Sequence, residues 1–345
     1  MHPGPAAVDA AGDPMSAAVP LPTLRHLRVD YVDGTPTHLL AQDGVFAVFG
    51  FGGAPAHVSD PRYLHVALEP HGPAPLEVWR VPGPVSTHVD GALRTSEDGV
   101  LQFGVIELTE PGTGATDIEA TAELAYRRLV DATAGRGYPH LLRAWNYLDG
   151  ITIGEGDAER YRTFCVGRAR GLAFDDPTAL PAATAIGRLD GARTLQVYWL
   201  ASTRPGTPLE NPRQLSAYRY PRQYGPQPPS FARAMLPPGA HMPLLISGTA
   251  AIVGHVSRHA DCVTTQVDET LANIDALLAA AHARQPGLSP RMDATTRLKV
   301  YVRDAGDLPV VAAHLDARLG PVPRLVLHAA ICRRELRVEI DGVHG

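Results

Sequence analysis

The fold is decided by the stretch Thr296–Gly320, which has the sequence TRLKVYVRDAGDLPVVAAHLDARLG. Its first part, Thr296–Arg303, has the pattern of a strand, and Asp307–Leu319 has the pattern of a helix. Pro309 lies in the first turn of that helix, where its missing N–H removes no hydrogen bond, and Gly320 lies just past the end. The stretch therefore predicts a strand followed by a helix with well-defined ends.

The same alternation of strands and helices extends to both sides of this stretch. The further predicted elements are the strand Leu244–Gly254, the helix Val267–His282, and the strands Arg324–Ile331 and Leu336–Ile340. Together these elements predict an α+β layer with helices on one face of a sheet.

The N-terminal half is richer in short β-type runs broken by Pro and Gly, so we expect it to be mainly antiparallel. The predicted strands are His26–Val32, Val45–Phe51, Tyr63–Leu68, Leu76–Val81, Val100–Leu108, Leu141–Leu148 and Thr194–Ala201. Helices are expected over Ile118–Ala134, where apolar residues recur at helical spacing before Gly135, and over Ala158–Arg170.

The length of 345 residues, with 45% hydrophobic content, suits two moderate domains. We expect a disordered leader at residues 1–22, a β-rich α+β domain at 23–200 and an α+β domain at 201–345 that carries most of the active site. Between the last two lies the Pro-, Arg- and Tyr-rich segment Ser202–Ser230. It is too long for a simple connection and too aromatic for a flexible linker, which is typical of a functional loop.

Composition excludes several classes of protein. There are 31 basic and 36 acidic residues, giving a formal charge of −5, with no basic block that could neutralise a row of phosphates, so nucleic acid is not an expected partner. The leader has no signal-peptide pattern and no apolar stretch is long enough to cross a bilayer, which predicts no membrane partner and a cytoplasmic location. Cys165, Cys262 and Cys332 form no CxxC pair and are expected to be reduced thiols; the simplest interpretation of each is a small buried apolar residue.

Motif analysis argues against three common chemistries. The run Gly50–Gly53 follows a strand but lacks the last glycine of GxGxxG and a following helix, so a turn is the better interpretation. His255 and His259 lack the glutamate of HExxH, and no cluster of two histidines and a carboxylate is found, so no metal and no cofactor are expected. Ser247 lies inside a predicted strand rather than a GxSxG turn, which disfavours a serine hydrolase.

Arginine and tyrosine recur together in the polar segments. They are Arg143, Trp145, Asn146 and Tyr147; Tyr161, Arg162 and Arg168; and Tyr218, Tyr220, Arg222, Tyr224 and Arg233. Guanidinium groups bind carboxylates with two parallel hydrogen bonds, and phenols add further donors, so this set suits a small substrate with more than one carboxylate. The alternative is exposed arginine with packed tyrosine.

The C-terminal segment contains a candidate acid. On the predicted strand Leu336–Ile340, Val338 takes the opposite face from Glu339. A glutamate directed into a closed apolar pocket has a raised pKa and can act as a general acid. The alternative is a solvated edge residue.

Six segments together resemble the chorismatase family, some of whose relatives are also labelled pteridine-dependent dioxygenase-like. The segments are RAWNYLDGI from Arg143, ERYRTFCVGR from Glu159, NPRQLSAYRYPRQYGPQPPSFARA from Asn211, LLISGTAAIVGH from Leu244, QVDETLANI from Gln266 and ICRRELRVEI from Ile331. The resemblance covers the chain from about Arg143 onward. It implies an α+β fold in which the C-terminal domain is like YjgF and chorismate mutase and the N-terminal domain is a more divergent relative.

The resemblance also implies a reaction without a cofactor, the cleavage of the enol ether that joins the ring of chorismate to its pyruvyl group. Glu339 occupies the family's acid position and would protonate the methylene. In one branch of the family water then attacks and a dihydroxycyclohexadiene carboxylate forms. In the other branch the ring's own hydroxyl displaces the pyruvyl oxygen, and an arene oxide rearomatises to 3-hydroxybenzoate.

Two positions suggest the 3-hydroxybenzoate branch. That branch carries a glycine in the strand matching LLISGTAA and a cysteine seven residues before the glutamate, where the hydrolytic branch tends to have alanine; here these residues are Gly248 and Cys332. Cys332 would steer the ring intermediate. Arg162 and Arg233 are the expected carboxylate ligands, Tyr147, Tyr161 and Tyr218 are expected to line the pocket, and Arg168 and Arg222 are weaker candidates.

Three alternatives stay open at this stage. The ring product could be 4-hydroxybenzoate, alone or mixed, or the diene. The chain could instead be a YjgF-like module that binds small carboxylates without catalysis, since a fold does not fix a function. An imine deaminase is the last alternative, and it leaves the segment Ser202–Ser230 unexplained. A monomer and a homotrimer are both compatible with the sequence.

Overall fold

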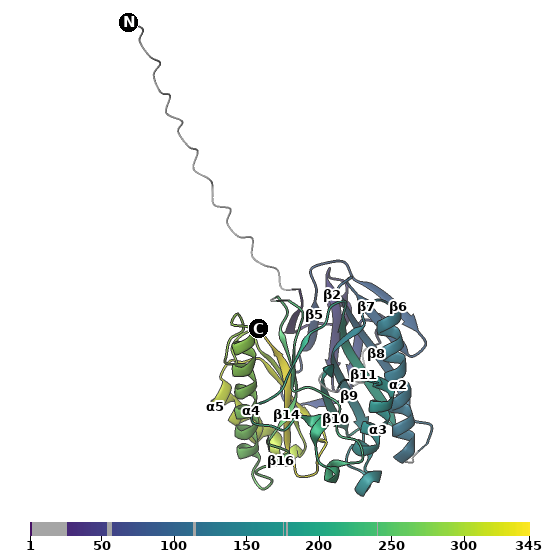
Figure 1. Ribbon diagram of the computed structural model, residues 1–345, viewed down its shortest axis with the longest axis vertical. Coiled ribbons are helices and arrows are strands. Elements are labelled where there is room, and N and C mark those ends of the chain that lie inside the picture. The colour runs from purple at the N-terminus through teal and green to yellow at the C-terminus, as the bar shows by residue number, and fades with distance from the viewer. Residues whose placement is uncertain (2–25, 54–56, 113–114, 175, 177–178, 240) are drawn as a thin grey trace.

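The computed structural model describes residues 1, 26–53, 57–112, 115–174, 176, 179–239 and 241–345. Two large sheets face each other in the centre of the molecule, and a pair of long helices covers the outer face of each sheet (Figure 1). The expected α+β fold class is confirmed. The predicted leader lies almost wholly outside the described residues.

The strands of the described residues form three main sheets and one short hairpin. The four-stranded sheet has the order β1 (Arg28–Val32), β5 (Leu76–Arg80), β2 (Val45–Phe51), β3 (Tyr63–Val66). The six-stranded sheet has the order β10 (Ala182–Arg188), β9 (His140–Asp149), β11 (Thr194–Ser202), β8 (Leu101–Thr109), β7 (Leu93–Glu97), β6 (Ser86–Asp90). The seven-stranded sheet has the order β12 (Thr207–Leu209), β13 (Ala234–Leu236), β14 (Leu244–Ala250), β19 (Val338–His344), β17 (Arg297–Val302), β18 (Arg324–His328), β4 (Glu69–Pro70). The hairpin pairs β15 (Ile252–Val253) with β16 (Val256–Ser257).

The helices are α1 (Pro36–Leu40), α2 (Ala115–Gly135), α3 (Arg160–Leu172), α4 (Val263–Arg284) and α5 (Leu308–Leu319). Single turns of 3₁₀ helix occur at Gly156–Ala158, Ala217–Arg219, Arg222–Tyr224 and Ala305–Asp307. Helices α2 and α3 pack on the six-stranded sheet, and α4 and α5 pack on the seven-stranded sheet. No described helix has an apolar stretch that would span a bilayer.

Alternate residues of strand β19 face two different layers of the molecule. Val338 and Ile340 pack into the core beneath α4 and α5, while Glu339 and Asp341 point to the opposite face, between the two sheets. The space between the sheets is otherwise filled by apolar and aromatic side chains such as Trp145. Two carboxyl groups placed in this layer must therefore find partners or lose their charge.

The two large sheets meet at strands β10 and β14. Ser247 of β14 accepts a hydrogen bond from the backbone N–H of Ala183 and donates one to the backbone oxygen of Ala232. A second link joins the backbones of Gly187 and Ala330. These links hold β10, the end of β14 and the segment before β19 around one space.

Most predicted elements of the C-terminal half are confirmed within a few residues. The predicted strand Leu244–Gly254 is wrong in its extent, because β14 ends at Ala250 and the chain turns into a separate hairpin. Strand β18 ends at His328, before the predicted Ile331, and β19 continues beyond Ile340 to His344.

Several strands were not predicted. The fully exposed β6 and the alanine-rich β10 lack the alternation that marks a half-buried strand. The predicted boundary near residue 200 stays a prediction; the chain passes to the seven-stranded sheet after β11, but β4 from the first half joins that sheet.

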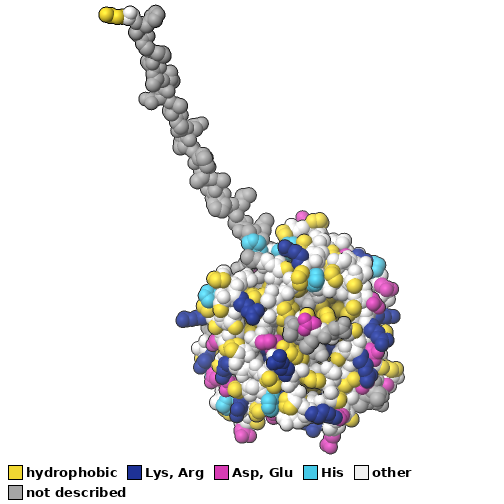
Figure 2. Space-filling model, viewed as in Figure 1, with side chains coloured by type: hydrophobic (Ala, Val, Ile, Leu, Met, Phe, Trp, Pro, Cys, Tyr) yellow, Lys and Arg dark blue, Asp and Glu magenta, His cyan; other side chains and the backbone are white. Residues whose placement is uncertain are grey.

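Acidic and basic side chains are interspersed over the face seen in Figure 2, without a block of one sign.

Candidate active site

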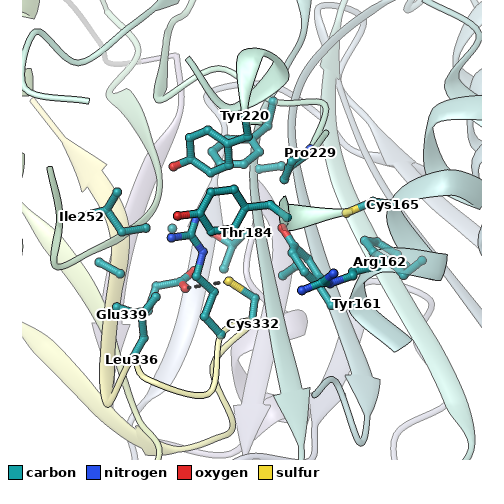
Figure 3. Close-up of a pocket in the computed structure, with 18 of the residues that line it drawn as sticks. Tyr161, Arg162, Cys165, Thr184, Tyr220, Pro229, Ile252, Cys332, Leu336 and Glu339 are labelled. Atoms are coloured by element: carbon teal, nitrogen blue, oxygen red, sulfur yellow. Dashed lines mark hydrogen bonds between the residues drawn. The ribbon is translucent and has the colours of Figure 1, made fainter. Parts of the chain in front are cut away.

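A pocket of about 460 Å³ lies where β10, β14, β19 and α3 converge, and the segment between β12 and β13 closes it from above (Figure 3). Its floor contains Thr184, Gly248 and Glu339. Five guanidinium groups and three carboxyl groups line it; they belong to Arg162, Arg168, Arg233, Arg333 and Arg334 and to Glu159, Glu335 and Glu339. Such an excess of fixed positive charge suits an anionic ligand.

Glu339 is a buried carboxylic acid at the end of this pocket. Its side chain is 5% exposed, and on β19 it pairs in register with Ala250 and Tyr301. Burial, together with the nearby charge of Asp341, raises the pKa of Glu339 to about 8, although the cationic groups of Arg143, Arg233 and Arg333 oppose the shift. The carboxyl group therefore holds its proton at neutral pH and can donate it.

Gly248 makes room for that carboxyl group. A Cβ atom at this position would lie 2.0 Å from Oε1 of Glu339 and 3.3 Å from Cγ2 of Thr184. Gly248 lies in an irregular part of β14, because the pairing with β19 shifts register between Ile246 and Thr249. Glycine is required here for space, since any side chain would displace the acid.

Two thiols and one phenol form the wall beside the acid. The Sγ atom of Cys332 lies 3.9 Å from Oε2 of Glu339 (Figure 3). Tyr161 packs on Phe164, and its hydroxyl group interacts with the thiol of Cys165. Burial raises the pKa of Cys332 well above its usual value and that of Cys165 to about 12, so both groups stay uncharged thiols.

Arg233 is held rigidly in the pocket wall. It is 3% exposed, and its Nη2 donates to the hydroxyl oxygen of Tyr220 at 2.7 Å and to the backbone oxygen of Leu215 at 2.8 Å. The guanidinium plane also lies over the rings of Tyr220 and Phe231. Its Nε has no hydrogen-bond partner within the described part of the chain.

Arg168 is placed in the same way from the opposite wall. Its Nε donates to the hydroxyl oxygen of Tyr126 at 2.8 Å, and its Nη1 donates to the backbone oxygen of Ser230. Nη2 is buried and, among the residues described, has no partner. A buried donor without a partner is costly, so this nitrogen is suited to an acceptor on a bound ligand.

The other two candidate arginines differ in their surroundings. Arg162 lines the pocket, and its only ion pair within the described residues is a loose one with Glu159, at 3.7 Å between Nε and Oε1. Arg222 lies outside the pocket, where it forms an exposed ion pair with Asp157. Arg162 is thus available to a ligand, whereas Arg222 is not placed to reach one.

Two tyrosines predicted to line the pocket do not do so. Tyr147 is fully buried between the sheets, where its hydroxyl group lies 3.1 Å from that of Tyr301. Alternation along β9 turns Asn146, its neighbour, to the pocket instead. Tyr218 is also absent from the lining, and Tyr220 and Tyr224 of the same segment take that position.

Sequence reasoning missed the contribution of β10, because that strand was not predicted. Thr184 lies on the pocket floor, and its hydroxyl group donates to Oδ2 of Asp341 at 2.8 Å. Arg333 was also missed; its guanidinium group lies over the rings of Tyr220 and Tyr224 and fixes them above the pocket. The only signal for Arg333 was its place in the resembling segment from Ile331.

No group of three or more His, Cys, Asp or Glu side chains that could hold a metal ion is found among the described residues.

The pocket presents a carboxylic acid with a raised pKa, uncharged thiols and several guanidinium groups. This combination is typical of enzymes that protonate a small anionic substrate.

Comparisons with known proteins identify the family. The model of the family described as "Chorismatase FkbO/Hyg5-like, N-terminal" matches residues 77–201. A chorismatase from Streptomyces hygroscopicus is 39% identical over 274 residues, which cover 77% of this chain and 78% of that protein. A 3-hydroxybenzoate synthase from the same organism is 35% identical over 240 residues, 65% of this chain and 69% of that protein.

A solved structure agrees with these sequence relationships. The crystal structure of a chorismatase matches with a TM-score of 0.80 and 33% identity, covering 92% of this chain and 98% of that one. The chain therefore belongs to the chorismatase family. The resemblance seen in the sequence is confirmed, and the α+β fold matches that of a solved chorismatase structure.

Proposed function

We propose that this enzyme cleaves chorismate to pyruvate and 3-hydroxybenzoate by an intramolecular route. The observation that carries the proposal is the buried Glu339, whose pKa burial raises to about 8, beside Cys332 and in the space that Gly248 leaves open. The relatives named chorismatase and 3-hydroxybenzoate synthase support the choice of substrate and product. Chorismate carries two carboxylates, which suits the excess of guanidinium groups in the pocket.

The reaction begins when Glu339 gives its proton to the methylene carbon of the enolpyruvyl group. The ether carbon then becomes an oxocarbenium-like centre, which weakens the bond between the ether oxygen and the ring carbon. The neighbouring ring hydroxyl attacks the ring carbon that bears the ether, the carbon–oxygen bond of the ring breaks, and pyruvate leaves. Opening of the resulting arene oxide and loss of a ring proton give 3-hydroxybenzoate.

This route needs no water, since the atoms of pyruvic acid and 3-hydroxybenzoic acid add up to those of chorismic acid. The attacking hydroxyl gives up one proton, which the phenol oxygen takes back when the oxide opens. The ring proton lost on rearomatisation replaces the one taken from Glu339, so the acid is regenerated. The protein's task is to hold the dianion with the ring hydroxyl aligned against the breaking bond and to keep water away. Fixed guanidinium groups perform the first part, and the apolar wall of Cys332, Leu336 and Ile252 performs the second.

The direct experiment is incubation of the purified, EDTA-treated protein with chorismate. Equimolar pyruvate and 3-hydroxybenzoate, identified by chromatography and mass, would support both substrate and product. A diene or 4-hydroxybenzoate as the main ring product would retain chorismate cleavage and contradict the branch. Untouched chorismate would contradict the proposed activity.

Replacement of Cys332 by alanine is expected to lower the fraction of 3-hydroxybenzoate and to raise that of the diene or another aromatic isomer. The reason is that loss of the thiol opens a space 3.9 Å from the acid's Oε2, which a water molecule can fill. The product ratio, measured by chromatography, checks this. Cys262→Ala is the matched control, because Cys262 is exposed and outside the pocket lining. An unchanged ratio in Cys332→Ala would remove the steering role.

Arg168→Met is expected to raise the KM for chorismate by about 10- to 100-fold, as the loss of a hydrogen bond to a charged group predicts. The buried Nη2 of Arg168 supplies that bond in our proposal. Arg170→Met serves as the control, since Arg170 lies on the same helix but pairs with Glu119 at the surface. Steady-state kinetics test both variants. Equal KM values in Arg168→Met and the wild type would mean that Arg168 holds no substrate carboxylate.

A further inference from the structure

A second carboxylate, Asp341, lies behind the pocket floor and does not line the pocket. It follows Glu339 by two residues and shares its face of β19. Its side chain is fully buried, and its Oδ2 accepts hydrogen bonds from Thr184 at 2.8 Å and from the hydroxyl group of Tyr301 at 3.0 Å. The same Oδ2 lies 3.3 Å from Nη2 of Arg143. These donors hold the side chain of Asp341 in place.

The charges under the floor balance without Glu339. Two buried cations, Arg143 and Lys299, face two buried anions, Asp341 and Glu77. Lys299 lies 3.1 Å from Oε2 of Glu77 and 3.9 Å from Oδ1 of Asp341. Within the described residues of this cluster, no cation is left over for a third carboxylate. Ionisation of Glu339 would therefore add an unbalanced charge to a buried layer.

The other groups that face the two carboxyl groups do not alter this balance. Burial raises the pKa of Tyr147, Tyr198 and Tyr301 above the usual value, so these phenols on β9, β11 and β17 stay neutral. On the pocket side, Cys332 and Tyr161 also stay neutral, for the same reason.

Two cations face Glu339 from the pocket side. Arg233 comes from the segment before β13 and Arg333 from the segment before β19, and both favour the ionised form of Glu339. These are the groups that a substrate dianion would engage, so they do not act as fixed counter-ions of Glu339 in the loaded pocket.

We infer that Asp341 is a positioning residue of this enzyme: by pairing with Nη2 of the buried Arg143, it offsets the positive charge that would otherwise stabilise ionised Glu339, and so keeps the proton on the acid. Asp341 touches no reacting atom and acts only through Glu339. The inference rests on the proposed role of Glu339 as the proton donor. It implies that the negative charge of Asp341 raises the pKa of Glu339 and that the positive charge of Arg143 lowers it.

The experiment compares Asp341→Asn, Arg143→Met and the double variant in the full-length protein. Glu339 is titrated directly from the infrared C=O stretch of its protonated carboxyl group, isolated as the difference between each variant and the same variant carrying Glu339→Gln. The pH profile of chorismate consumption is recorded in parallel. Because the infrared titration needs no substrate, it still decides the role of Asp341 if chorismate proves not to be consumed.

The expected shifts have opposite signs. Asp341→Asn leaves Arg143 free to pair with Glu339. The infrared titration midpoint of Glu339, and the pH at which chorismate consumption is lost, should therefore both fall by about one to two pH units. Turnover measured at the wild-type midpoint then falls about 5- to 50-fold, because a smaller fraction of Glu339 is protonated there, and it recovers at lower pH. Arg143→Met should raise both of these pH values. In the double variant both should lie close to the wild-type values, since one charge of each sign is removed together.

The result that overturns the inference is a titration of Glu339 that stays at its wild-type position in Asp341→Asn. A shift of the same sign in Asp341→Asn and Arg143→Met would overturn it equally. If Asp341→Asn does not fold, as thermal unfolding would reveal, the other two variants carry the test. An uncharged pair of similar volume is often tolerated in place of a buried ion pair. If the titration midpoint of Glu339 in Arg143→Met then equals that of the wild type, the proposed charge balance is contradicted.

Discussion

Replacement of Glu339 by glutamine is expected to lower the turnover of chorismate by about 10²- to 10⁴-fold, the range that a general acid contributes. Glutamine has nearly the same shape and fits the space left by Gly248, but it has no proton to give to the methylene carbon. The Kd for chorismate, measured by calorimetry on the inactive variant, should stay within about threefold of the wild-type KM, because the guanidinium groups that hold the dianion are unchanged.

Glu335→Gln is the matched control for this prediction. Glu335 lies at the exposed mouth of the same pocket, where it accepts a hydrogen bond from Ser257. Its replacement should leave turnover within about threefold of the wild type, as for most exposed sites. Substantial residual turnover in Glu339→Gln, or an equal loss in Glu335→Gln, would show that Glu339 is not the acid.

The pH profile gives an independent view of the same group. Because the pKa of Glu339 is raised to about 8, the acid is protonated below that pH and ionised above it. The wild-type kcat/KM should therefore be retained at neutral pH and lost as pH rises through about 8. The small residual kcat/KM of Glu339→Gln should not show this loss at alkaline pH.

Replacement of Gly248 by alanine is expected to lower the rate of 3-hydroxybenzoate formation by about 10²-fold, the cost of a misplacement of about 1 Å. The added Cβ would lie 2.0 Å from Oε1 and 3.0 Å from Cδ of Glu339, so the carboxyl group must turn away from its position. The acid then meets the methylene at a different angle, and the ring hydroxyl loses its alignment. A larger share of the remaining product should be the diene.

Gly135→Ala is the control, since a Cβ at Gly135 meets no atom within 4 Å. Its rate and product ratio should equal those of the wild type. Thermal unfolding of Gly248→Ala should show a folded protein, because the carboxyl end of Glu339 is the movable partner in the clash. Unchanged formation of 3-hydroxybenzoate in Gly248→Ala would mean that the acid does not depend on this space.

The C-terminal half of the fold could be predicted because its residues obey strong local rules. The helix Leu308–Leu319 has Pro309 in its first turn and ends before Gly320, and both residues have the positions that helix ends favour. Strand β10 could not be predicted in the same way. Its sequence AATAIGR is buried on both faces and has no alternation, so it lacks the signal that marks a strand with one solvated face.

The sequence predicted only some of the residues that line the pocket, and the chemistry assigned to them stays a prediction. Resemblance to the family supplied Glu339, Cys332 and Gly248, and the structure brings these three together. Tyr147 failed because alternation tells which residues share a face of β9, but not which face meets the pocket. Asp341 was missed because the predicted strand ended one residue before it, at Ile340, and because its importance depends on partners from three other strands.

Conversion of chorismate that carries oxygen-18 in its ring hydroxyl tests the central claim most directly. The intramolecular route moves that oxygen onto the neighbouring ring carbon, so we predict equimolar unlabelled pyruvate and 3-hydroxybenzoate that retains the label. Unlabelled 3-hydroxybenzoate would mean that the hydroxyl is lost as water and would contradict the displacement step. A labelled diene as the main product would instead assign the enzyme to hydrolysis.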